Sequence, residues 1–452
     1  MSQSVPFSKQ RISLHPNNQP SGNKYTATTF PQINFVIARQ QAMLLPGTLR
    51  LNGTFNLLNN NNNPVNTPSL ASSATNGASL NNRIGISSVL EEVSISTLNG
   101  RNLETVRNYN RYLASSKPIM NNMFDYNNGL NLEDPFLSSK SVSNSRVANV
   151  ETQFSIPIEV GMLGDQPINI SEKGFHGLQL NLLLAQNATV SQPYFNYLLG
   201  SNPQISLATD LYDYELKNVF LTFEVIKPPP EFFNKLPSSG LLSFNTISTL
   251  HSNIQSSDTT VNLRLGCNNA ISTTHTLIPA VHANNRNVDS FRLCEPEVNV
   301  TTTQKGVQAK IRTVQYMRAG QLFPYNFVLD SENQGVEGVP QTMIQEPALN
   351  SISLYDNKHI SFNPMSNVSI NTKSAFAGSD VGLPKPVAND PESIFVLGVP
   401  MDSTKQGVSF RDREYAIRIQ SGLDDTTANT LNTFVRCRNI AEYSPTGVNV
   451  LE

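Results

Sequence analysis

Apolar and polar residues alternate in short runs along most of this chain. The cleanest run places Phe154, Ile156 and Ile158 on one face of an extended segment, with Pro157 on the other face. A period of two is typical of a half-buried β-strand, and a proline inside the run indicates an edge strand or a bulge. Comparable rows occur at Ile33/Phe35/Ile37, Val89/Glu91/Val93/Ile95, Leu178/Leu180/Leu182/Leu184 and Val219/Leu221/Phe223/Val225.

The segment Lys227–Glu231 interrupts this pattern. Its three consecutive prolines remove three backbone donors, so no sheet ladder continues through it. The sequence therefore predicts two β-sandwiches, over residues 31–227 and 241–452, joined by a proline-rich linker at 228–240. In the second half the alternation resumes at Val261/Leu263/Leu265, Val307/Ala309/Ile311, Phe395/Leu397/Val399 and Tyr415/Ile417/Ile419.

Helical periodicity is scarce. The best case is Leu103, Val106, Tyr109 and Leu113, whose spacing predicts one helix of about three turns after Asn102. Many short strands separated by Pro, Gly and Asn turns, without alternating helices, favour sandwiches or barrels over a parallel α/β sheet. We therefore expect an all-β fold with a few short helices.

Three stretches lack the strand pattern. Residues 1–30 contain Lys9, Arg11 and Lys24 but no acidic residue, which predicts an extended, mildly basic N-terminal arm. Such an arm is either an internal strap that contacts inner components of a particle or a disordered terminus. Residues 59–82 and 330–350 are rich in small polar residues and predict long loops, which are either tolerated surface insertions or segments that lock copies together.

The composition narrows the classes of function. Charged residues make up only 15% of the chain, and 32 basic residues balance 34 acidic ones without a basic block, which argues against specific recognition or packaging of nucleic acid. No window approaches the length of apolar sequence that crosses a bilayer, and the first 25 residues lack the apolar centre of a signal peptide. We expect a soluble protein that is made in the cytoplasm and is not secreted.

No cluster of residues suggests a reaction. Cys267, His275, His282 and Cys294 have intervals that do not match zinc-site spacings. Glu91 and Glu92 are adjacent on an expected strand, so their side chains point to opposite faces and indicate a sheet edge or a subunit contact. Asp424 and Asp425 fit a solvated loop better than a cation site. The sequence predicts no catalytic residues, no metal and no cofactor.

The three cysteines, Cys267, Cys294 and Cys437, are far apart in sequence. An odd number cannot form a closed set of intramolecular disulfides, and proteins made in a reducing compartment rarely contain them. We therefore expect reduced thiols that serve as small buried side chains.

Two stretches resemble the major capsid proteins of virophages and polinton-like viruses, which are small eukaryotic double-stranded DNA viruses. The first is Gly85–Ile95 (GISSVLEEVSI), followed by Asn99-Gly100, Leu103-Glu104 and Asn108-Tyr109-Asn110. It is similar to a strand pair that leads into a short helix of the first jelly roll. The second, Val314–Met317 (VQYM) with Leu322–Pro324 (LFP), is similar to an aromatic, proline-bearing strand of the second jelly roll.

The resemblance implies two upright, eight-stranded, antiparallel jelly-roll sandwiches in tandem. Because this chain is short for the family, we expect reduced tower loops. The resemblance also implies a homotrimer that presents six similar sandwiches as a pseudo-hexameric capsomer and tiles an icosahedral shell. The implied partners are neighbouring capsomers, penton proteins and minor capsid proteins, and the implied location is the virion.

Three other functions fit parts of the sequence. A minor capsid, penton or spike protein would share the β-rich composition and differ in copy number per particle. A carbohydrate-binding tandem sandwich would present surface Trp or stacked aromatics, whereas this chain has no Trp. A secreted adhesin would carry a signal peptide and more cysteines. The major capsid protein, acting by self-assembly and without enzymatic activity, accounts for most of these features.

Overall fold

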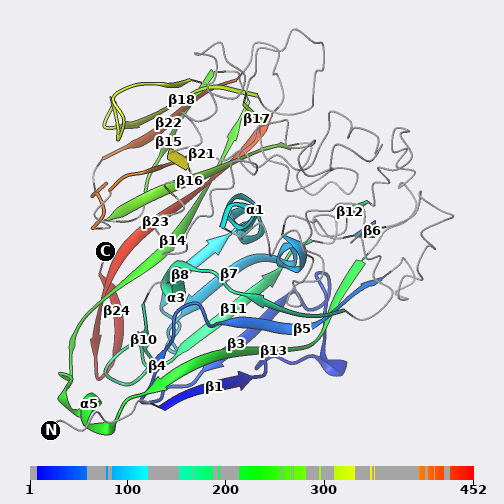
Figure 1. Ribbon diagram of the computed structural model, residues 1–452, viewed down its shortest axis with the longest axis vertical. Coiled ribbons are helices and arrows are strands. Elements are labelled where there is room, and N and C mark those ends of the chain that lie inside the picture. The colour runs from blue at the N-terminus through cyan, green and yellow to red at the C-terminus, as the bar shows by residue number, and fades with distance from the viewer. Residues whose placement is uncertain are drawn as a thin grey trace, which may run out of the picture.

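Strands form most of the architecture in the computed structural model of the chain (Figure 1). The structure describes residues 8–58, 78–79, 84–120, 152–164, 166–186, 192–193, 213–255, 258–265, 267, 269–280, 295–296, 310–330, 347–348, 351, 397–402, 406–411, 413–421 and 428–451.

The first half of the chain supplies most of the first sandwich. Its elements are β1 (Ser8–Leu14), β2 (Lys24–Tyr25), β3 (Gln32–Ile37), β4 (Met43–Leu44), β5 (Arg50–Leu58), β6 (Ala78–Ser79), β7 (Leu90–Ser96), β8 (Asn102–Arg107), α1 (Tyr109–Met120), β9 (Thr152–Pro157), α3 (Gly161–Gly164), β10 (Ile168–Asn169), β11 (Leu178–Leu184), β12 (Gln192–Pro193) and β13 (Asp213–Lys227), with 3-10 turns η1 (Ser21–Asn23) and η2 (Gly85–Val89).

The second half builds the second sandwich. Its elements are α5 (Pro230–Lys235), β14 (Gly240–Ile254), β15 (Asp258–Leu263), β16 (Ala270–Pro279), β17 (Glu295–Pro296), β18 (Lys310–Arg318), β19 (Gln321–Leu322), β20 (Leu329–Asp330), β21 (Leu397–Pro400), β22 (Tyr415–Ser421), β23 (Asn429–Ser444) and β24 (Gly447–Leu451).

Two buried apolar clusters lie between the sheets. A seven-stranded sheet, β10-β4-β13-β5-β9 with β1 and β2 also on β13, faces the region of a nine-stranded sheet that holds β8, β7, β11 and β3. The other region of the nine-stranded sheet, β21-β16-β23-β14, faces a six-stranded sheet around β15, β22 and β18. Nearly all described strand pairs are antiparallel; β8–β14 and β17–β18 are parallel. The predicted all-β architecture with two cores is confirmed.

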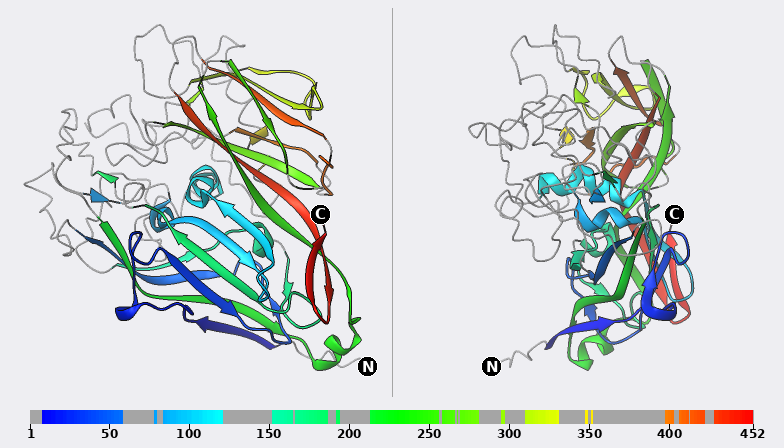
Figure 2. Two further views of the ribbon diagram at one scale, coloured as in Figure 1. Left: turned by 180° about the vertical axis from the view of Figure 1, so that it is seen from behind. Right: turned by 90° about the vertical axis from the view of Figure 1, so that its right-hand side faces the viewer.

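One pair of long strands serves both cores. β14 and β23 pair along their whole length, from Gly240↔Tyr443 to Ile254↔Asn429, and run from the lower sandwich into the upper one (Figures 1 and 2). On one face of this pair, Phe244 belongs to the first core and Ile254 to the second. We call β14 and β23 the crossing ribbon.

Several strand predictions are confirmed. The Leu178–Leu184 row is β11, and its four leucines at even positions are buried. Pro157 ends β9, which is the last strand of its sheet, as a proline-bearing run predicts. The alternation therefore identified the strands that bury one face against one core.

The structure differs from the expected start of the helix and adds detail to the expected arm and linker. The helix begins at Tyr109, because Leu103 and Val106 lie on β8, which pairs with β7. Ser8–Leu14 of the expected arm is a strand of the first sheet, because Ile12 and Leu14 pack against the first core. The expected linker at 228–240 contains α5, which begins at Pro230, where the missing donor is tolerated in the first helical turn. Whether the two halves are independent domains stays a prediction.

Candidate functional site

The junction between the two cores is the most elaborate polar site among the described residues. Glu104 on β8 is 3% exposed and accepts hydrogen bonds from three backbone N–H groups. The donors are Gly161 at 2.9 Å and Met162 at 2.8 Å, both on α3, and Ile247 at 2.7 Å on the crossing ribbon. One carboxyl group therefore ties the first sandwich to the ribbon.

Burial is the largest influence on the Glu104 carboxyl and raises its pKa to about 7. The three N–H donors and the charge of Arg436 act in the opposite direction. Loss of hydration destabilises the charged carboxylate by more than these partners stabilise it. The junction therefore contains an acid that titrates near neutral pH.

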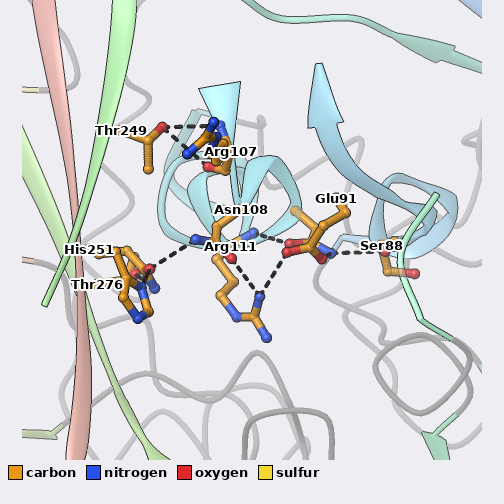
Figure 3. Close-up of polar contacts among 10 residues, drawn as sticks. Ser88, Glu91, Arg107, Asn108, Arg111, Thr249, His251 and Thr276 are labelled. Atoms are coloured by element: carbon orange, nitrogen blue, oxygen red, sulfur yellow. Dashed lines mark hydrogen bonds and ion pairs between the residues drawn. The ribbon is translucent and has the colours of Figure 1, made fainter. Parts of the chain in front are cut away.

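The start of α1 forms a second link across the junction (Figure 3). Asn108 precedes the helix with φ 51°, a left-handed conformation that Asn tolerates better than most residues. Its carbonyl accepts from the N–H groups of Arg111 and Tyr112, both at 3.0 Å. Its side-chain amide donates to Asn432 of the ribbon at 3.1 Å. The cap of this helix thus also holds the second half of the chain.

Asn432 joins three segments of the chain. Its Oδ1 accepts from Asn108 and lies 3.1 Å from Nδ1 of His251 on β14, and its Nδ2 donates to Thr276 on β16 at 3.3 Å. Nearby, the hydroxyl of Thr249 and the backbone of Arg107 exchange two hydrogen bonds of 3.2 Å (Figure 3). This network fixes the register between α1 and the sheet of the second sandwich.

Glu91 belongs to this network, and Glu92 lies at its border. Glu91 accepts from Asn110 at 3.2 Å and pairs with Arg111 at 3.4 Å, while Glu92 pairs with Arg107 at 3.4 Å. Their strand β7 lies between β8 and β11, so the prediction of a sheet edge is wrong. The sequence contains no sign of this role, because the partners of Glu91 come from α1 and that of Glu92 from the end of β8.

An aromatic and polar stack occupies the second core. His275 on β16 is fully buried, lies 2.8 Å from the Thr433 hydroxyl and stacks on Tyr316 at 5.6 Å between ring centroids. Burial lowers the pKa of His275 to about 3. Tyr316 in turn stacks on Tyr415, whose hydroxyl lies 3.0 Å from that of Thr273. His275 is therefore a neutral structural side chain.

The other residues considered for chemistry are not brought together. His282, Cys294, Asp424 and Asp425 lie outside the described residues. Within the portion of the chain that the structure describes, no three His, Cys, Asp or Glu side chains are grouped closely enough to hold a metal ion. Among the same residues, no helix has the length and apolar character to cross a membrane.

The prediction of reduced cysteines is wrong for two of the three. Cys267, between β15 and β16, forms a disulfide with Cys437 on β23, and their Cα atoms are 6.1 Å apart. The two residues are 170 positions apart in sequence, so only the assembled second sandwich brings them together. With three cysteines not all can be paired, but two of them can still form one disulfide.

One face of the crossing ribbon, at the end near β24, exposes three aliphatic side chains beside polar ones such as Glu442, which lies opposite Leu241. Ile440 on β23 is paired with Leu451 on β24 and with Ser243 on β14, and Leu241 lies on the same face of β14. Leu241 is 66% exposed, Leu451 43% and Ile440 37%. A grouped set of exposed aliphatic side chains is uncommon on a monomer and typical of a contact surface.

No protein-family model matches the chain, and no curated protein matches it by sequence. Solved structures are similar over its full length. The chain matches a quasi-atomic structure of the PBCV-1 virus capsid with a TM-score of 0.56 at 8% identity, covering 100% of this chain and 98% of the other. It matches the Faustovirus major capsid protein with a TM-score of 0.54 at 11% identity, covering 97% and 92%. It matches the cryo-EM structure of the Sputnik virophage with a TM-score of 0.53 at 10% identity, covering 100% and 90%.

These similarities establish the fold. Each spans at least nine tenths of both chains, so the match includes both sandwiches and their connection. The chain has a double jelly-roll fold, as its strand pattern and its resemblance to capsid proteins predicted.

Proposed function

We propose that this chain is a major capsid protein that assembles as pseudo-hexameric homotrimers into an icosahedral shell. The observation that carries the proposal is the double jelly-roll fold. The similarity to solved capsid structures covers both sandwiches and the connection between them. On this proposal the protein acts in the virion, is not an enzyme, and contacts neighbouring capsomers, penton proteins and minor capsid proteins.

The architecture suits this role for a physical reason. Two sandwiches held rigidly in one chain become six similar units when three copies meet around a threefold axis. Such a block contacts up to six neighbours, which allows flat tiling. The relative position of the two sandwiches must then be fixed, and the network around Glu104, Asn108 and Asn432 supplies that rigidity.

We assign one contact between copies to the exposed face that carries Leu241, Ile440 and Leu451. This face lies on the crossing ribbon, so a second copy packed against it would contact the strand pair that also positions both sandwiches. A net charge of -2 leaves little repulsion between copies.

Mass measurement of the purified full-length chain tests the proposal. Light scattering should give three times the chain mass of 49.7 kDa, and negative-stain micrographs should contain particles with a hexagonal outline. A stable monomer at micromolar concentration, without such outlines, would contradict the proposal. Copy number in purified particles separates a major from a minor capsid protein.

A pair of matched variants tests the assigned contact. Leu241→Asp should lower the trimeric fraction, because it removes the most exposed aliphatic side chain of this face and places a second acidic group opposite Glu442. Leu322→Asp is the control, since Leu322 is also an exposed leucine, 36%, but lies on β19 of the second sandwich. Equal trimeric fractions for the two variants would place the contact elsewhere.

A further inference from the structure

The disulfide between Cys267 and Cys437 lies where the crossing ribbon passes from one core to the other. Cys437 is fully buried, and its neighbours across the sheet are Thr246 on β14 and Ala270 on β16. Farther along β23, Ala441 and Tyr443 belong to the first core, while Val435 and Leu431 belong to the second. The bond therefore holds the ribbon at its transition point.

Cys267 lies in the connection from β15, a strand of the six-stranded sheet, to β16, which pairs with β23 in the nine-stranded sheet. The bond thus fastens this connection to the crossing ribbon just before β16 begins at Ala270. Cys267 is 9% exposed and Cys437 is fully buried, so Cys267 is the residue nearer to solvent.

We propose that this disulfide is a redox-controlled clamp, open while the chain is kept under reducing conditions and closed when the folded protein meets an oxidant. In closing, one thiol attacks a low-molecular-weight disulfide such as oxidised glutathione, and the second thiol displaces the attached thiol. The two cysteines lose two electrons and two protons, and the glutathione disulfide is reduced to two thiols. The clamp goes beyond the capsid role, because it concerns the folded chain itself.

The order of events follows from the sequence separation. In an unfolded chain, Cys267 meets Cys294 more often than Cys437, because loop closure favours the nearer residue. Only the native sheets bring Cys437 to Cys267. The pair formed on oxidation therefore reports whether the chain was already folded.

Thiol counting on the full-length protein tests the clamp. The native chain kept under reductant should react with three equivalents of an alkylating agent after unfolding, and the chain treated with oxidised glutathione should react with one. Peptide mapping should identify the Cys267–Cys437 pair. Oxidation in urea should instead favour Cys267–Cys294. Three free thiols after native oxidation, or the same pair from both treatments, would overturn the proposal.

Thermal unfolding tests the consequence. A bond that closes so long a loop should raise the unfolding midpoint of the oxidised chain by about 5 °C relative to the reduced chain. Cys294→Ser should keep this difference, and Cys267→Ser should abolish it. Equal midpoints for oxidised and reduced wild type would show that the bond does not clamp the fold.

Discussion

Glu104→Gln is the most informative single change at the junction. Gln has the shape of Glu but carries one oxygen and one NH₂ group. If the Gln oxygen accepts from the N–H groups of Gly161 and Ile247, the Gln NH₂ group faces the N–H of Met162. Two donors then face each other, and the buried Met162 N–H has no acceptor. Loss of that hydrogen bond should lower the free energy of unfolding by about 1–3 kcal/mol at acidic pH.

The effect of Glu104→Gln on stability should also depend on pH, because the wild-type side chain titrates. Burial raises the Glu104 pKa from 4.5 to about 7. An acid that binds its proton more tightly in the folded state stabilises the fold fully below pH 4.5, and this stability is lost as pH rises to about 7. The shift corresponds to about 3 kcal/mol. Because Gln does not titrate, the stability of the wild type relative to the variant should fall by about this amount between pH 4.5 and 8, so that the variant is at least as stable as the wild type at pH 8.

Urea unfolding of both proteins at several pH values measures this difference. Glu92→Gln is the control, since Glu92 lies on the neighbouring strand in a half-exposed ion pair and should change stability by less than about 1 kcal/mol. A difference between wild type and Glu104→Gln that stays constant or grows with rising pH would refute the reasoning, because it would mean that the folded state favours the carboxylate.

Three further outcomes are expected. Gly161→Ala should cost about 1–3 kcal/mol, because its Cβ would lie 2.8 Å from the Thr246 backbone, whereas Gly164→Ala, with open space around it, should be neutral in the same thermal assay. At the start of α1, Asn108→Gly should be better tolerated than Asn108→Ala in thermal unfolding, because φ is 51° there; the reverse order would contradict the left-handed cap. Burial lowers the pKa of His275 to about 3, so the stability that this neutral ring provides is present above pH 6.5 and is lost as pH falls toward 3. The stability of His275→Gln should therefore fall less steeply with acid than that of the wild type. Identical acid dependence of stability in the two proteins would argue against this role.

The sequence predicts strands that bury one face against one core. The leucines of β11 and the apolar residues of β13 alternate cleanly because their other faces meet water or polar side chains. The crossing ribbon was missed for the opposite reason. Where β23 runs through the second sandwich, Val435 on one of its faces contacts the second core and Phe434 on the other contacts α1, so both faces are buried and no alternation appears.

The junction is invisible to sequence patterns for a related reason. Glu104, Asn108 and Asn432 are ordinary polar residues whose partners are far away along the chain. Buried polar side chains on β16, such as Thr273 and His275, indicate a turn or an exposed strand when taken alone. The Cys267–Cys437 pair likewise depends on the finished sheets.

The crossing ribbon also constrains how the protein is made. The first core contains Phe434, Tyr443 and Val448, which are synthesised long after the strands of the N-terminal half that they pack against. The N-terminal half therefore has an incomplete interior until these residues have been made, and such long-range contacts make folding slow. Fragments that lack β23 and β24 would leave that interior open, so they should aggregate.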